Sequence, residues 1–101
     1  MHPDLSVQRE VLIRSYRLYL DADRDWNIAV REAKTWFPAR RRATAIMFGD
    51  PGSRVRRLYE ARERALQRLL IAREKLENAR QRLARIRQQD QVRTRILLLS
   101  A

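Results

Sequence analysis

Glycine and proline are confined to three places in this chain of 101 residues: Pro3, Pro38 and the stretch Gly49-Asp50-Pro51-Gly52. Both residue types disfavour the interior of a helix, so they divide the chain into two long segments that contain neither. We expect one helix over residues 5–37 and a second over about 54–98. The chain then has one place to turn, and this favours an all-α fold.

Apolar side chains of the first segment recur at alternating steps of three and four residues, with Arg9 and Asp23 as polar interruptions. The stripe consists of Leu5, Leu12, Tyr16, Tyr19, Trp26, Val30, Ala33 and Phe37. This spacing is a heptad seam and predicts packing against another helix. The aromatics Tyr16, Tyr19, Trp26, Trp36 and Phe37 also suggest a platform for stacking nucleic-acid bases, but we expect them to pack in the core.

The second segment contains two seam rows. One row is Leu58, Ala65, Ala72, Ala79 and Ile86, and the other is Arg62, Leu69, Leu76, Leu83, Asp90 and Leu97. Small alanines permit close approach of a facing helix, and the aromatic seam supplies the bulk that they leave unfilled. We therefore predict a single domain over 1–101, a long antiparallel, coiled-coil-like helical hairpin with a basic linker at 38–53. The second helix contains more residues than the first, and each residue adds about 1.5 Å to its length. Roughly the last dozen residues of the second helix should therefore extend beyond the hairpin.

Two polar features interrupt these seams. Asp23 is expected to form a structural ion pair with Arg62 or Arg68 of the second helix. Asp90 and Arg93 break the second seam, so Asp90 is also a candidate cap for a separate terminal helix. Asp21, Asp23 and Asp25 alternate as in a calcium loop, but the pattern lacks the glycine and distal glutamate, and we assign no metal site.

Catalysis is not expected from this composition. The chain has no cysteine, and its one histidine, His2, lies near a terminus, where it cannot be held in place for catalysis. We therefore predict a non-enzymatic protein without a cofactor. The longest apolar runs have four residues, far below the ~20 that a membrane-spanning helix needs, so no integral membrane contact is expected. The N-terminus has no pattern of a secretory signal, which favours a cytoplasmic location.

The net charge of the whole chain is +11, and the positive charge is concentrated in two clusters. Residues 1–37 contain equal numbers of basic and acidic side chains. One cluster lies at the connecting end of the hairpin and consists of Arg40, Arg41, Arg42, Arg54, Arg56 and Arg57. The other lies on the second helix and includes Arg80, Arg82, Arg85 and Arg87. Such clusters predict nucleic-acid binding through phosphates, with low sequence specificity, in which the connecting-end cluster makes the main contact and the other cluster a second one. The alternative role of both clusters is to keep a helical surface soluble.

The connecting stretch has two interpretations. The spacing of Ala45, Gly49, Val55 and Leu58 resembles the tight turn of helix-turn-helix DNA-binding proteins. This resemblance implies that the second helix begins with DNA-contacting residues. Alternatively, residues 50–53 form a type II β-turn, with proline and glycine at its two central positions, and we favour this turn.

Several apolar residues fall outside the seams, and a two-helix hairpin cannot bury them alone. Those expected at a protein interface are Leu18, Leu66, Leu70 and Ile71, together with Ile96, Leu97, Leu98 and Leu99, which lie beyond the reach of the first helix. They predict a homodimer, in which the hairpins complete a helical bundle, or a complex with another helical protein. The alternative function is thus a coiled-coil adaptor or assembly subunit that grips a partner helix.

Overall fold

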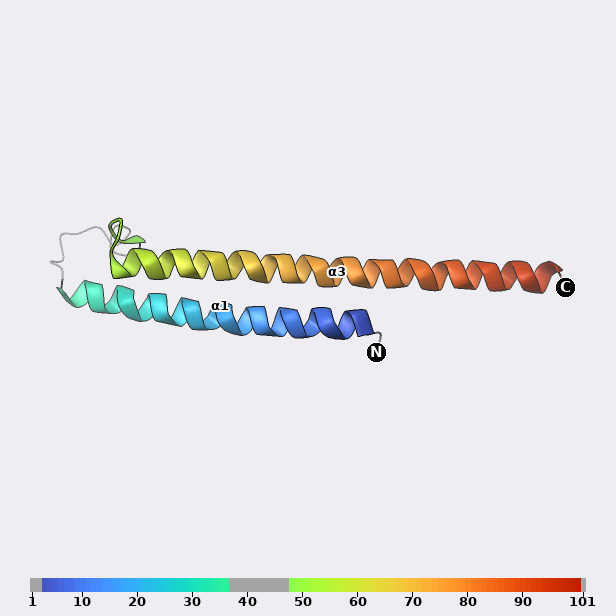
Figure 1. Cartoon of the computed structure of the whole chain (residues 1–101), viewed down its shortest axis with the longest axis horizontal. Coiled ribbons are helices and arrows are strands. Elements are labelled where there is room, and N and C mark those ends of the chain that lie inside the picture. The colour runs from blue at the N-terminus through green and yellow to red at the C-terminus, as the bar shows by residue number, and fades with distance from the viewer. Residues whose placement is uncertain (1–2, 37–47, 101) are drawn as a thin grey trace.

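The computed structural model describes residues 3–36 and 48–100, and within these ranges it consists of two long helices and no strand. Helix α1 spans Pro3–Trp36 and helix α3 spans Arg54–Ser100. The two helices run side by side in opposite directions (Figure 1), and the molecule measures 82 × 21 × 18 Å. The predicted all-α, long antiparallel helical hairpin is confirmed.

The helix ends agree with the predicted bounds to within a few residues. Helix α1 begins at Pro3, two residues before the predicted start, because the fixed φ of proline suits the first turn of a helix. Phe37 and most of the linker, including Arg40–Arg42, lie outside the described residues. Helix α3 begins at Arg54 and continues to Ser100, so Asp90 does not cap a separate helix.

A tight turn immediately precedes α3. The amide of Ser53 donates to the carbonyl oxygen of Asp50 at 3.0 Å, and Gly52 has a φ of +79°, as a type II turn requires. The favoured turn is therefore confirmed, whereas Ala45 of the helix-turn-helix alternative lies outside the described residues. Gly49 also has positive φ, and a Cβ there would lie 2.6 Å from Ser53 Oγ, so only glycine fits without a shift. Ser53 Oγ accepts from the amide of Arg56 at 3.1 Å and caps α3.

The core lies at the turn end of the hairpin and follows the predicted seams. Buried Trp26 and Val30 pack with Val55, and the Trp26 ring lies 6.0 Å from that of Tyr59. Ala29, which the predicted stripe omitted, is buried beside them because it lies three residues after Trp26 on the same side of α1. Farther along α3, the buried seam residues are Ala65, Ala72, Leu76 and Ala79.

Two aromatic residues that we expected in the core are exposed. Tyr16 is 52% exposed and Trp36 is 85% exposed. A two-helix hairpin has a single narrow interface, so a large ring at the edge of the seam or at the last turn of α1 keeps contact with water. The expectation of core packing is therefore wrong for Tyr16 and Trp36 and correct for Trp26.

Helix α3 is longer than its partner, and its C-terminal end extends past the N-terminus of α1 (Figure 1). We call residues 54–83 the paired part of α3 and residues 84–100 the overhang. Every residue of the overhang is exposed. Over the residues that are described, neither helix contains a stretch long and apolar enough to cross a membrane.

Candidate functional site

The described arginines at the connecting end are partly neutralised by acidic neighbours. Arg54 donates to Glu32 of α1 at 2.9 Å, and Arg56 donates to Glu60 at 3.1 Å. The guanidinium of Arg56 also lies 5.7 Å from the centre of the Tyr59 ring. Arg57 is exposed. This end of the hairpin thus presents less uncompensated charge within the described residues than its sequence suggests.

The arginines near the end of α3 have far fewer acidic neighbours. Arg80, Arg82, Arg85 and Arg87 are all exposed, and Arg80 has Glu77 at 3.9 Å. From residue 78 to the end of the chain, Asp90 is the one acidic residue, whereas there are six arginines. None of the overhang arginines forms an ion pair with another described residue. The four arginines of the overhang, Arg85, Arg87, Arg93 and Arg95, therefore form a cluster of positive charge without acidic partners among the described residues.

Helical spacing distributes these arginines over two sides of α3. Arg80 and Arg87 are seven residues apart, which places them on one side, about two turns from each other. Arg82 and Arg85 are three residues apart and share another side. Phosphates can therefore bind this part of α3 on more than one side, because guanidinium groups project from both sides of the helix.

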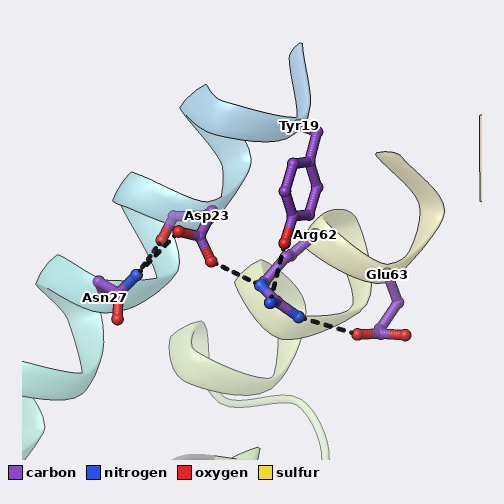
Figure 2. Close-up of polar contacts among 5 residues, drawn as sticks. All are labelled: Tyr19, Asp23, Asn27, Arg62 and Glu63. Carbon is purple, nitrogen blue, oxygen red and sulfur yellow. Dashed lines mark hydrogen bonds and ion pairs between the residues drawn. The ribbon is translucent and has the colours of Figure 1, made fainter. Parts of the chain in front are cut away.

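One part-buried arginine of α3 is engaged between the two helices. Arg62 donates through Nε to Asp23 Oδ1 at 2.7 Å and through Nη2 to the Tyr19 hydroxyl at 3.0 Å (Figure 2). Its Nη1 donates to Glu63 at 3.1 Å, and the guanidinium lies 5.0 Å from the centre of the Trp26 ring. The hydrogen bond to Asp23 raises the pKa of Arg62 above its ordinary value. Of the two predicted partners of Asp23, Arg62 and Arg68, the structure selects Arg62, and this ion pair fixes the register of the hairpin.

An apolar groove runs between the two helices on one side of the hairpin, with a volume of about 640 Å³. Its apolar lining consists of Leu12, Ile13, Tyr16, Leu69, Leu70 and Leu76, and its charged lining consists of Arg17, Arg73, Glu77 and Arg80. Of the predicted mid-hairpin interface residues, Leu70 lines this groove, whereas Leu18, Leu66 and Ile71 do not. Ile13, which follows the seam residue Leu12, was not predicted and lines the groove, and Tyr16, which was predicted in the seam, lines the groove as well.

The predicted interface residues at the end of the chain lie on the overhang. Ile96, Leu97, Leu98 and Leu99 are 59%, 63%, 73% and 88% exposed. Four consecutive residues of a helix point in four different directions, so these side chains do not form one apolar face. Among the described residues there is no group of histidine, cysteine, aspartate and glutamate side chains that could hold a metal ion.

The chain was compared with known protein families, curated proteins and solved structures. No family model, no curated protein and no solved structure matches the chain.

Proposed function

We propose that this protein binds nucleic acid without catalysis, mainly through phosphates, and that the arginines near the end of α3 make the principal contacts. One observation supports this most strongly: Arg80, Arg82, Arg85 and Arg87 are exposed on a helix where Asp90 is the one acidic residue after Glu77. Guanidinium groups bind phosphate oxygens through paired hydrogen bonds and remain charged at all physiological pH values.

The proposed contacts favour phosphate over base recognition. Phosphate contacts position a protein on nucleic acid but carry no sequence information by themselves. Each neutralised phosphate releases counterions, so affinity falls steeply as salt rises. The arginines at the connecting end would supply a second, weaker contact, because Arg54 and Arg56 already have acidic partners.

The test is fluorescence anisotropy of random-sequence duplex DNA and single-stranded RNA, titrated with the protein from low to physiological salt. Replacing Arg80, Arg82, Arg85 and Arg87 by glutamine should reduce the salt slope by about 3 to 4 and the affinity at physiological salt by roughly 10-fold or more. Glutamine has a helix propensity similar to that of arginine, so the fold should be kept.

A matched control removes the same charge elsewhere. Arg14, Arg31, Arg64 and Arg68 are exposed, and their replacement by glutamine lowers the net charge equally. We expect this control to bind much more tightly than the first variant. Equal losses in the two variants would mean a generic polycation effect and would overturn the proposal. A third variant with glutamine at Arg54, Arg56 and Arg57 measures the contribution of the connecting end.

The groove between the helices supports a second candidate function, an adaptor that binds a helix of another protein. The apolar residues of the groove would contact the apolar stripe of that helix. The groove is also lined by three arginines and one glutamate, which favours acidic side chains beside that stripe on the partner. A synthetic amphipathic peptide with leucines at helical spacing and glutamates beside them should therefore bind. Leu70→Ser should abolish this binding, and the same peptide with lysine flanks should bind more weakly. Equal binding of both peptides would refute the adaptor function at this groove.

A further inference from the structure

The overhang of α3 is a helix without a packing partner. All of its residues are exposed, and its exposed apolar side chains include Ile86, Val92 and the run Ile96–Leu99. An isolated helix of this length is only marginally stable in water, because most helical stability in proteins comes from packing an apolar face. A partner on the overhang would remove this apolar surface from water and hold the helix.

The two seam rows that face α1 continue into the overhang without a change of spacing. In the paired part these rows place Ala65, Ala72, Leu76 and Ala79 against α1, and all four are buried. Beyond Leu83 the same rows reach Ile86, Asp90, Arg93, Leu97 and Ser100. The surface of α3 that holds α1 therefore continues past the end of α1, where it is open to another helix of the same repeat.

This continued seam is complementary to itself when a second copy is turned end for end. Around a two-fold axis between residues 91 and 92, Asp90 of each copy lies opposite Arg93 of the other. Parallel packing in register would instead place Asp90 opposite Asp90 and Arg93 opposite Arg93, so the charges select the antiparallel orientation. The other facing pairs of the antiparallel arrangement are Ile86 with Leu97 and Leu83 with Ser100.

The residues beside the seam are compatible with this arrangement. Heptad geometry places Arg87 opposite Thr94 and Gln89 opposite Ile96, so no like charges face each other along the flanks. Within the described hairpin neither Asp90 nor Arg93 takes part in an ion pair. Both side chains are exposed and therefore accessible to a second copy.

We propose that this protein forms a homodimer in which the overhangs of two copies pack antiparallel along the continued seam. The dimer is a rod with one hairpin at each end and the two turns at its tips. Two Asp90–Arg93 ion pairs fix the register, and the Ile86–Leu97 contacts on either side bury apolar surface. This assembly is independent of nucleic-acid binding, and its test contains no nucleic acid.

Exchange of charge at the two seam positions tests the pairing by sedimentation velocity. The wild type should show twice the chain mass of 12.1 kDa. Asp90→Arg places arginine opposite Arg93, and Arg93→Asp places aspartate opposite Asp90, so each variant alone should be monomeric. An equimolar mixture of these two variants should form a heterodimer, because every arginine then faces an aspartate. The double variant Asp90→Arg/Arg93→Asp should again form a homodimer.

Arg95→Asp is the matched control, because it makes the same charge change on the side of α3 that faces away from the seam. This control should remain dimeric, and far-UV circular dichroism should show an intact hairpin in every variant. A wild type that is monomeric at its highest soluble concentration would overturn the proposal. So would a dimer that survives Asp90→Arg, or a mixture of the two single variants that stays monomeric. A dimer that is lost with Leu70→Ser but kept with Asp90→Arg would place the interface at the groove and equally overturn it.

Discussion

The paired part and the overhang of α3 have the same heptad spacing but very different surroundings. In the paired part, Ala72, Leu76 and Ala79 are buried against α1. In the overhang, Ile86 and Leu97 occupy the same two rows and are 52% and 63% exposed. The repeat determines which side of α3 is available for packing, and the length of α1 determines how much of that side is used. Burial in a helical hairpin is therefore a property of both helices together.

The largest expected difference between the two parts comes from truncating leucines of the same row. Leu76 is 5% exposed, so Leu76→Ala removes buried methyl groups and should lower the free energy of unfolding by about 2 to 5 kcal/mol. Leu97→Ala removes a side chain that is already largely in water and should change it by less than about 0.5 kcal/mol. Urea denaturation, followed by circular dichroism at concentrations low enough to keep the chain monomeric, measures both. Equal effects would show that the overhang packs on the hairpin.

A smaller difference is expected between the polar residues of that row, Arg62 and Asp90. Arg62→Gln removes the ion pair with Asp23 and leaves part-buried hydrogen-bonding groups without their charged partner, at a cost of about 1 to 3 kcal/mol. Asp90 is exposed in the hairpin, so Asp90→Asn should change monomer stability by less than about 0.5 kcal/mol. The same denaturation experiment applies. If Asp90→Asn destabilised the monomer as much as Arg62→Gln, the overhang could not be an independent helix.

The sequence was sufficient to predict the architecture and its central ion pair. Glycine and proline located the turn, and the heptad rows predicted the buried alanines of α3. The height at which two antiparallel helices bring residues together predicted Arg62 or Arg68 as the partner of Asp23, and the structure selects Arg62. Each of these features depends on the local conformational preferences of residues or on a simple repeat, so a single sequence is enough to predict it.

Other features could not be predicted because they depend on the width and extent of the interface. The stripe containing Tyr16 does not reveal that the ring lies at the edge of a groove and remains half exposed. Residues 88–91 contain neither glycine nor proline, yet Asp90 as a possible cap left the continuity of α3 undecided. For the candidate site, the sequence located the arginines, but the acidic partners of Arg54 and Arg56 emerged only from the folded structure.

The smallest expected effect concerns how independently the overhang unfolds. Ala84 is the first residue of the overhang and is exposed. Ala84→Gly adds backbone freedom in a helix interior, which costs about 0.5 to 1 kcal/mol locally. Because no residue of the overhang is buried, we expect it to open without disturbing the hairpin, and amide hydrogens of residues 85–100 should then exchange roughly 2- to 5-fold faster in the monomer. Ala79→Gly is the matched substitution at a residue 2% exposed, and it should lower the stability of the whole hairpin.

Ala84→Gly should leave the exchange of the slowest amides near Ala72 unchanged. If those amides also accelerated, α3 would unfold as one cooperative unit, and the boundary between its two parts would have no energetic meaning.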